Sequence, residues 1–234
     1  MERTRLAPGV PVLRRADGSL QLGYDARHSV PIGGADPRPT PVSLLPEKPA
    51  RHGYIKIMTF GPSGPALSTQ ARALVAGADQ AQPGVRTDVL LVAGAGEPRR
   101  RLLDGAMSAG TAQVLVRFIE GSAYVGPFVL PGSTACLRCI DAAETDRDPS
   151  WPVLLEQYCA FSETVHGDGS DEVVEHSLAA LALAWAVRDA QAFIAGRRPS
   201  TWSATLRLDP WLRDISARSW RPHPSCGCAW TMEV

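Results

Sequence analysis

Two closely spaced pairs of cysteines constrain the fold of this sequence more than any other feature. Cys136 and Cys139 form a CxxC pair, and Cys226 and Cys228 form a CxC pair near the end of the chain. Glycine or proline lies close to each pair, as is typical of tight turns. Four thiolates in two such turns make the tetrahedral ligand set of a structural zinc ion. The sequence therefore predicts a zinc staple that joins two distant segments.

Other interpretations of these cysteines are open. A CxxC motif can be a redox pair, buried free cysteines are common as small hydrophobic residues, and the CxC pair can be a tail feature without a partner. Zinc is favoured because both pairs are short-spaced in a chain that we expect to stay reduced. Cys159, flanked by Tyr158 and Ala160 in a predicted helix, is expected in the core. His223 is a further candidate ligand, but beside four thiolates we expect it at the surface or next to the site.

The composition indicates a soluble protein that works in the cytoplasm. Lys+Arg and Asp+Glu number 24 each, so the formal net charge is zero, which argues against nucleic acid or an anionic membrane as a partner. The same balance leaves room for a homodimer. The charged first residues do not resemble a secretion signal, and the most apolar stretch, 178–187, is too short to span a bilayer.

The first fifty residues predict a small β structure followed by a linker. Asp17-Gly18 separates two short apolar runs, which predicts a hairpin over 10–24, with a third strand over 29–32. Prolines at 37, 39, 41, 46 and 49 predict an extended linker. We therefore expect three parts: a hairpin region at 1–35, a linker at 36–52 and an α/β domain at 53–234.

The remainder alternates strands and helices in the pattern of an open α/β sheet. The apolar run at 88–93 suits a central parallel strand covered on both faces. The longest predicted helix, 171–196, carries Val174, Leu178, Leu181 and Trp185 on one stripe. The other predicted strands are 54–60, 111–119, 122–130, 201–208 and 215–220, and the other predicted helices are 67–77, 97–109, 140–145 and 151–161.

Three segments resemble a known family. They are Gly126-Pro-Phe-Val-Leu-Pro-Gly-Ser-Thr-Ala-Cys-Leu-Arg-Cys139, Asp146-Arg-Asp-Pro-Ser-Trp-Pro152 and His223-Pro-Ser-Cys-Gly-Cys228. They resemble the ThiF/MoeB superfamily, which is similar to ubiquitin-activating enzymes. Within it, they look most like the ThiF-like leader-peptide-binding partners of YcaO cyclodehydratases in azole and azoline peptide biosynthesis.

The resemblance implies a fold and a set of partners. The expected fold is a truncated Rossmann-like, ThiF-type sheet, parallel or mixed, with helices on both faces, the four-cysteine zinc site and a short N-terminal hairpin. Catalytic members bind ATP, adenylate a peptide C-terminus and usually dimerise. Members allied to YcaO enzymes instead carry an N-terminal winged-helix domain that holds the leader of the precursor peptide.

The nucleotide site of the catalytic members does not map onto this chain. The glycine turn, Gly61-Pro-Ser-Gly-Pro65, contains two prolines, which have no N–H to donate to phosphate. Residues 78–87 are too few for the strand, helix and strand that complete an active site, so Asp79 and Arg86 are interpreted as solvated loop charges. We therefore expect no ATP and no cofactor-binding residue.

The winged helix also looks truncated, because residues 25–52 have no helical period. The hairpin would be its remnant, and a hairpin edge can still accept an added peptide strand.

No other catalytic set stands out. The five histidines (28, 52, 166, 176 and 223) are scattered. His176 with Glu172 could form an acid–base pair, although a solvated helix face is favoured. Ser63 sits in a turn like a nucleophile elbow but lacks the full motif.

The sequence thus favours a non-catalytic partner or scaffold that binds a precursor peptide or a YcaO-type modifying enzyme. The alternatives are an active ATP-dependent adenylating or sulfur-transfer enzyme, and a purely structural subunit of a biosynthetic complex. Four C-terminal tryptophans, at 202, 211, 220 and 230, are candidates for an interface, whereas Trp185 is expected in the core.

Overall fold

The structure is a computed structural model that describes residues 11–24, 30–32, 53–75, 86–166 and 172–228. The chain divides into two compact units, residues 1–50 and 51–234. The described part of the first unit is a three-stranded antiparallel sheet of β1 (Val12–Arg14), β2 (Leu20–Leu22) and β3 (Val30–Ile32). The predicted hairpin and its third strand are thus confirmed, while the expected linker at 36–52 lies outside the described residues.

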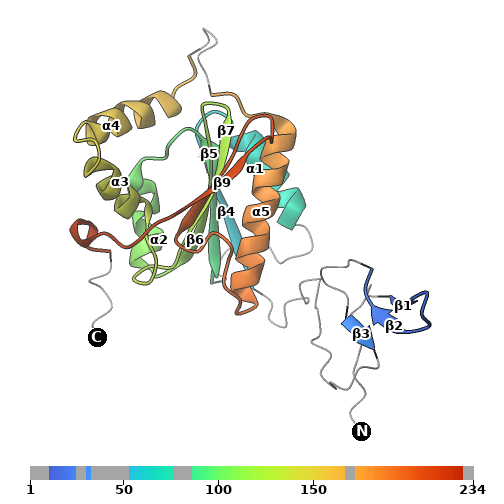
Figure 1. Cartoon of the computed structure of the whole chain (residues 1–234). Coiled ribbons are helices and arrows are strands. Elements are labelled where there is room, and N and C mark those ends of the chain that lie inside the picture. The colour runs from blue at the N-terminus through green and yellow to red at the C-terminus, as the bar shows by residue number, and fades with distance from the viewer. Residues whose placement is uncertain (1–10, 25–29, 33–52, 76–85, 167–171, 229–234) are drawn as a thin grey trace. The chain divides into compact units, whose positions relative to one another are not determined.

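The second unit is built on a six-stranded mixed sheet (Figure 1). The strands lie in chain order, with β4, β5 and β6 parallel and the later neighbours antiparallel. Their bounds are β4 (Ile55–Phe60), β5 (Val89–Ala95), β6 (Ala112–Ile119), β7 (Ser122–Val129), β8 (Ala204–Leu208) and β9 (Ile215–Ser219). Every residue of β5 is buried, as its apolar run predicts for a central parallel strand.

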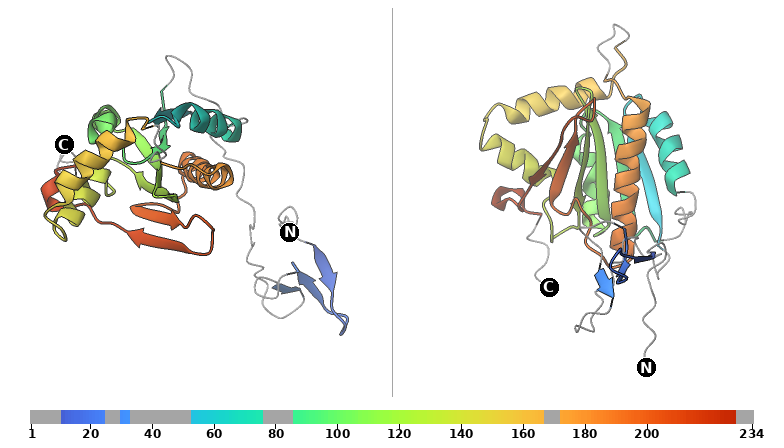
Figure 2. Two further views of the ribbon diagram at one scale, coloured as in Figure 1. Left: turned by 90° about the horizontal axis from the view of Figure 1, so that it is seen from above. Right: turned by 45° about the vertical axis from the view of Figure 1, so that its right-hand side comes forward.

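Helices cover both faces of this sheet, as expected (Figures 1 and 2). The helices α1 (Gly64–Val75) and α5 (His176–Ile194) pack on one face, where Val114 and Val116 of β6 point. Leu115 points to the other face, into a second core. That second core includes residues of the short 3₁₀ helix η1 (Arg100–Leu103), of α2 (Asp104–Ser108) and of α3 (Leu137–Thr145). The helix α4 (Trp151–Ser162) follows α3.

The longest helix is shorter than its sequence predicts. It begins at His176 because the Glu175 carboxylate accepts hydrogen bonds from the Ser177 and Leu178 amides, which makes Glu175 the N-cap. The predicted stripe is also wrong in part, since Val174 precedes the helix and Leu181 is exposed. The buried face consists mainly of small residues with Leu178, Leu183 and Val187.

By length and hydropathy α5 would suffice to cross a membrane. Its buried face, however, packs against β5, β6 and β7 in the first core, as expected of the central helix of an α/β domain.

Three other helix starts differ from the prediction. The helix expected at 97–109 is η1 followed by α2, because Pro98 disfavours the helical conformation at Glu97. The helix expected at 67–77 begins at Gly64. The helix expected at 140–145 begins at Leu137, which places Cys139 in its first turn.

A buried carboxylate ties the end of α5 to the segment that leads into β8. Asp189 is 3% exposed and accepts hydrogen bonds from the backbone N–H and the hydroxyl of both Ser200 and Thr201, at 2.5–2.9 Å. Four bonds to one carboxylate offset the cost of burying it.

We expect Asp189→Ala to lower the free energy of unfolding by about 1–3 kcal/mol, because it leaves buried donors without an acceptor. Chemical denaturation of the purified chain measures this change. Arg188→Ala, at the neighbouring exposed position, is the control and should change stability by less than about 0.5 kcal/mol. Equal effects at the two positions would contradict the assigned role of Asp189.

Candidate functional site

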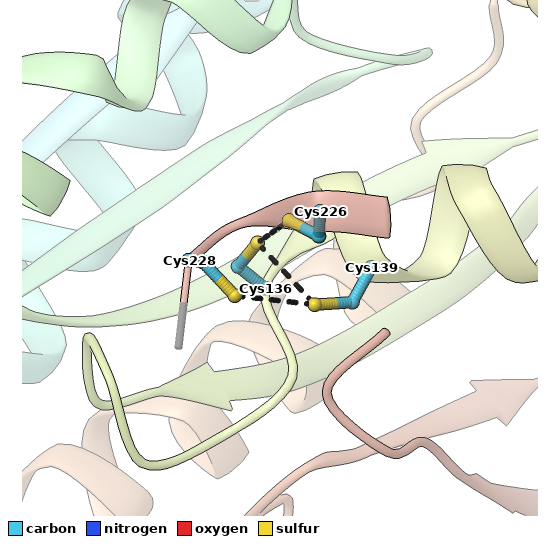
Figure 3. Close-up of side chains that lie close together, drawn as sticks. All are labelled: Cys136, Cys139, Cys226 and Cys228. Atoms are coloured by element: carbon cyan, nitrogen blue, oxygen red, sulfur yellow. Dashed lines mark hydrogen bonds between the residues drawn. The ribbon is translucent and has the colours of Figure 1, made fainter. Parts of the chain in front are cut away.

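The structure brings Cys136, Cys139, Cys226 and Cys228 together (Figure 3). All four sulfur atoms lie within 4.8 Å of one another. The Sγ atoms of Cys136 and Cys226 are 3.5 Å apart, and those of Cys139 and Cys228 are 3.3 Å apart. Four thiolates around zinc at about 2.3 Å are separated by about 3.8 Å from each other. The cluster therefore has the spacing needed to hold a metal ion.

The local backbone geometry of each cysteine pair explains why its two sulfur atoms face the same cluster. Cys136 is the N-cap residue of α3, so Cys139 follows one helical turn later on the same side. The 3₁₀ helix η2 (Pro224–Cys226) ends at Gly227, whose φ of 73° turns the chain back so that Cys228 also faces the cluster.

His223 positions the tail and does not join the sulfurs. Its Nε2 lies 2.9 Å from the Asp146 carboxylate at the end of α3, and its Nδ1 accepts a hydrogen bond from the Ser225 amide. The C-terminal segment is therefore fixed to α3 by an imidazole–carboxylate contact as well as by the cysteines.

The electrostatics of the cluster favour a cation. A hydrogen bond from Cys136 lowers the pKa of Cys139 to about 4, and the same contact raises the pKa of Cys136 above its usual range. Burial raises the pKa of Cys228 to about 12. Without a cation the crowded thiols cannot all ionise, whereas a metal ion stabilises all four thiolates. A closed shell of four sulfurs leaves no position for a reactive water, so such an ion would be structural.

Cys159 is separate from this cluster. It is buried in α4, its Sγ lies 3.6 Å from the Pro98 carbonyl oxygen, and burial raises its pKa to about 11. It is a core residue, as its sequence context predicts.

The carboxyl ends of the parallel strands are filled by the end of α4. In open α/β sheets this edge is where ligands usually bind. Here a Cβ atom on Gly61 would lie 2.9 Å from the Ser162 carbonyl oxygen, and one on Gly96 would lie 1.9 Å from Ser162 Oγ. Ser162 Oγ also accepts the Glu97 amide at 3.1 Å and donates to the Tyr158 carbonyl at 2.7 Å. The absence of side chains at the glycines after β4 and β5 thus allows Ser162 at the end of α4 to approach the strands.

The space left at this edge is small. The remaining cavity measures about 30 Å³ and is bordered by Ser63, His166 and Glu172, among others. That volume suits one or two water molecules. The Glu172 carboxylate accepts hydrogen bonds from the Tyr158 hydroxyl and from the Glu120 amide, so the less favoured alternative, an acid–base pair of His176 and Glu172, is not formed. His176 instead contacts Gln70.

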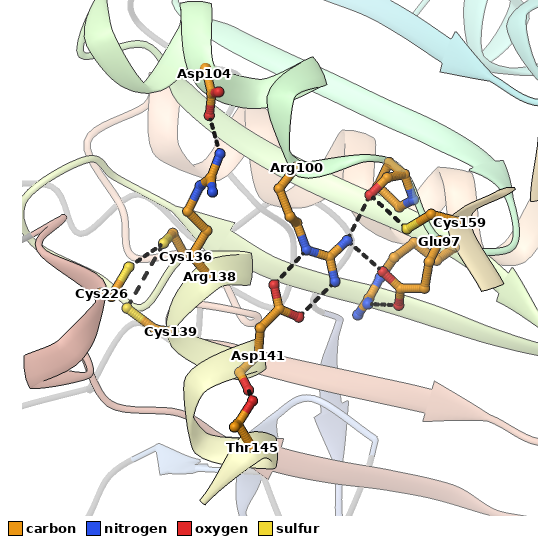
Figure 4. Close-up of polar contacts among 12 residues, drawn as sticks. Glu97, Arg100, Asp104, Cys136, Arg138, Cys139, Asp141, Thr145, Cys159 and Cys226 are labelled. Carbon is orange, nitrogen blue, oxygen red and sulfur yellow. Dashed lines mark hydrogen bonds and ion pairs between the residues drawn. The ribbon is translucent and has the colours of Figure 1, made fainter. Parts of the chain in front are cut away.

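A network of four charged residues, two of them buried and two half-buried, lies next to this edge, and Figure 4 labels three of them, Glu97, Arg100 and Asp141. Arg100 makes a bidentate pair with Asp141 at 2.7–2.8 Å and also contacts Glu97 at 2.8 Å. Arg117 pairs with the other oxygen of Glu97. Burial alone would raise the pKa of Glu97, but the two guanidinium groups hold it below its usual value. The network joins η1, β6 and α3.

Sequence reasoning missed this network because its members come from different elements. One available signal was Arg117, the one charged residue of the strand 112–119, whose other members apart from Gln113 are apolar. Another was Glu97, an acidic residue two positions after a fully buried strand.

A groove of about 690 Å³ lies beside the network, between α3 and α4 on one side and β7, β8 and β9 on the other. Its floor and walls combine aromatic, aliphatic and charged side chains. They include Arg117, Tyr124, Leu154, Trp151, Arg207 and Trp220.

The remaining residues that the sequence singled out do not form a second site. Arg86 is exposed, while Asp79, His28, His52 and Trp230 lie outside the described residues. Trp185 is half-buried against the first core, and Trp202 stacks on Phe128. Trp211 is 74% exposed at the turn between β8 and β9.

Comparisons with known proteins identify the fold. No family model matches the sequence, and no curated protein matches it either. Three solved structures are similar in fold at low identity. The heterocyclase TruD is 15% identical with a TM-score of 0.58, over 75% of this chain and 27% of that chain. Escherichia coli MccB is 12% identical with a TM-score of 0.52, over 79% and 67% respectively.

The third is a chain of the E. coli microcin synthetase McbBCD complex, which is 13% identical with a TM-score of 0.54, over 95% of this chain and 99% of that chain. This chain thus spans about a quarter of the length of TruD but nearly the full length of the chain from the complex. The likeness agrees with the resemblance drawn from the sequence motifs, and it establishes that the second unit has the same type of α/β fold as these proteins.

Proposed function

We propose that this chain is a non-catalytic partner protein in the maturation of a ribosomally made peptide. The observation that carries the proposal is the placement of Ser162 and the end of α4 against Gly61 and Gly96. This packing fills the space beside the glycine turn after β4, where a cavity of only about 30 Å³ is left and where a nucleotide phosphate would bind. The two prolines in the glycine turn also support a non-catalytic role, because they lack the N–H groups that would bind phosphate.

The biosynthetic setting is supported by the sequence motifs and by the fold. TruD is described as a heterocyclase, and the McbBCD complex as a microcin synthetase. The ThiF-like motifs around the cysteines resemble partners of YcaO cyclodehydratases. We therefore propose that the partners of this chain are a precursor peptide, a YcaO-type modifying enzyme or both, in the cytoplasm. The neutral net charge permits a homodimer.

We further propose that the metal held by Cys136, Cys139, Cys226 and Cys228 is zinc. A four-sulfur shell of this spacing suits zinc, and the cytoplasm keeps thiols reduced and available for it. The ion would join the start of α3 to the C-terminal segment.

The recruitment role is tested by capture of the partners encoded beside this gene. Purified full chain should retain the neighbouring precursor peptide or modifying enzyme at micromolar concentration, measured by pull-down and calorimetry. If neither binds, and deletion of residues 1–52 leaves product formation in cells unchanged, the recruitment role is wrong.

For the metal, we expect a single zinc ion per chain by elemental analysis of protein purified without chelators. Cys139→Ala should lose the ion and a large part of the unfolding free energy, because metal-binding energy is also folding energy. Cys159→Ala is the matched control and should retain zinc, because Cys159 lies outside the cluster. Absence of stoichiometric zinc from the natural sequence would refute the assignment.

For catalysis, we expect no ATP–pyrophosphate exchange by the isolated chain, with or without the precursor peptide, because the strand ends are occupied by α4. The assay should follow the protein across gel-filtration fractions, so that a contaminating enzyme is recognised. Exchange activity that coincides with the protein peak would favour the rival function, an ATP-dependent adenylating enzyme.

A further inference from the structure

In the described part of the chain, the outer edge of β9 and the groove beside it form one exposed surface. β9 is the last strand of the sheet, and all of its residues are exposed. Edge strands usually carry a proline, a bulge or inward charges that block pairing. The sequence of β9, Ile-Ser-Ala-Arg-Ser, has one charged residue, Arg218, whose guanidinium pairs with Glu144 and stacks over Trp220 at 3.9 Å.

The hydrogen-bond pattern shows which backbone groups of β9 are free. The Asp209 amide donates to the Asp214 carbonyl, and the Trp220 amide donates to the Ser203 carbonyl. Because hydrogen-bonded pairs alternate along an antiparallel ladder, Ser216 and Arg218 also direct their backbone groups toward β8. The backbone groups of Ile215, Ala217 and Ser219 therefore point outward, with the spacing that an added strand requires.

The side chains next to this edge form an ordered row across the sheet. The strand register places Arg117 opposite Tyr124, Tyr124 opposite Arg207, and Arg207 opposite Ser216. All four side chains border the groove. Ser216 is small, so a long side chain on an added strand can pass over it toward Arg207, two strand spacings or about 10 Å away.

Not every arginine that borders the groove has an acidic partner in the described part of the chain. Glu97, Asp141 and Glu144 are each paired with an arginine that borders the groove. Arg207 donates to the Ser122 hydroxyl at 3.0 Å and has no acidic partner within the described ranges. At the inner end, Arg117 Nε and Trp151 Nε1 lie just beneath the surface without a hydrogen-bond acceptor among the described residues. Glu120 also borders the groove, so four carboxylates and four arginines surround it, and the unmatched donors lie locally at Arg207, Arg117 Nε and Trp151 Nε1.

The opposite wall is apolar. Leu154 of α4 is 50% exposed although it borders the groove, and Leu155, Ile140 and Trp220 border it as well. A groove of 690 Å³ bordered by both apolar and charged side chains has the size of a site for several side chains.

We infer that an extended peptide segment with acidic residues pairs with the outward edge of β9 and places alternate side chains in this groove, an acidic one beside Arg207. The backbone pairing would supply affinity and the groove would supply selectivity. The inference rests on the proposed function only for the source of the peptide, which would be the precursor.

Two synthetic probes test this site without knowledge of the precursor: fluorescein-labelled decapeptides that alternate valine with glutamate or valine with lysine. Fluorescence anisotropy with the full chain should show saturable binding of the glutamate peptide, and at least about tenfold weaker binding of the lysine peptide. Arg207→Glu should reverse this preference. Arg213→Glu is the control, because it makes the same charge change at an exposed position outside the groove.

A second variant tests the backbone pairing. Ala217→Pro removes an outward N–H while leaving the hydrogen bonds to β8, so it should abolish binding of both peptides. Ala217→Gly keeps the N–H and should retain binding. Melting curves establish that each variant is folded.

Three results would overturn the inference. They are no binding of the glutamate peptide up to about 1 mM, binding unaffected by Arg207→Glu and Ala217→Pro, and a dimer of the natural chain that Ala217→Pro converts to monomer. The last result would assign the edge to a second copy of the chain. Failure of the synthetic probes would leave capture of the precursor through another surface intact, so the two proposals fail separately.

Discussion

The last turn of α4 contacts the glycines that follow β4 and β5, and the arrangement of the residues around it depends on this contact. Ser162 fills the space next to Gly61 and Gly96, and its hydroxyl satisfies the Glu97 amide. Glu97 is thereby held at the end of β5, where it binds Arg100 and Arg117. The same helix that closes the strand ends also supplies the apolar wall of the groove, through Leu154 and Leu155. α4 thus packs against the ends of β4 and β5 and also borders the groove.

The four cysteines secure the other end of this arrangement. They hold the C-terminal segment against α3, and His223 with Asp146 adds a second contact between the same two segments. The segment between β9 and Cys226 is consequently fixed at both ends, and Trp220 is packed against the second core. Loss of the metal would therefore loosen the β9 side of the groove as well as the tail.

The sequence predicted best those features that depend on residues close together in the chain. The cysteine pairs, the buried run of β5 and the Asp-Gly turn each depend on residues within a few positions of one another. The predicted start of α5 was wrong because the Glu175 side chain caps the helix at this point. Hydropathy alone does not reveal such a cap. The predicted stripe on α5 was wrong in part because the small residues at 182, 186 and 190 form the fully buried face of the helix, whereas Leu181 is exposed.

The site itself was only half predictable. The cysteine cluster could be predicted, because the short spacing within each pair is visible in the sequence. The role of Ser162 could not, because α4 reaches the glycine turn through tertiary packing, and its sequence carries no signal for that contact. The salt-bridge network of Glu97, Arg100, Arg117 and Asp141 likewise joins residues from several elements. The prediction that no nucleotide-binding set can be assembled came from the glycine turn and the short segment after it, whereas the packing of Ser162 beside Gly61 and Gly96 could not be foreseen.

The central claim is that this chain assists a modifying enzyme without performing chemistry of its own. Its most direct test is a reconstituted maturation assay with the neighbouring precursor peptide and modifying enzyme, in which product formation and ATP consumption are followed together. The account predicts that adding this chain speeds modification at low precursor concentration, and that ATP is consumed only when the modifying enzyme is present. Consumption of ATP by this chain and the precursor alone would contradict it.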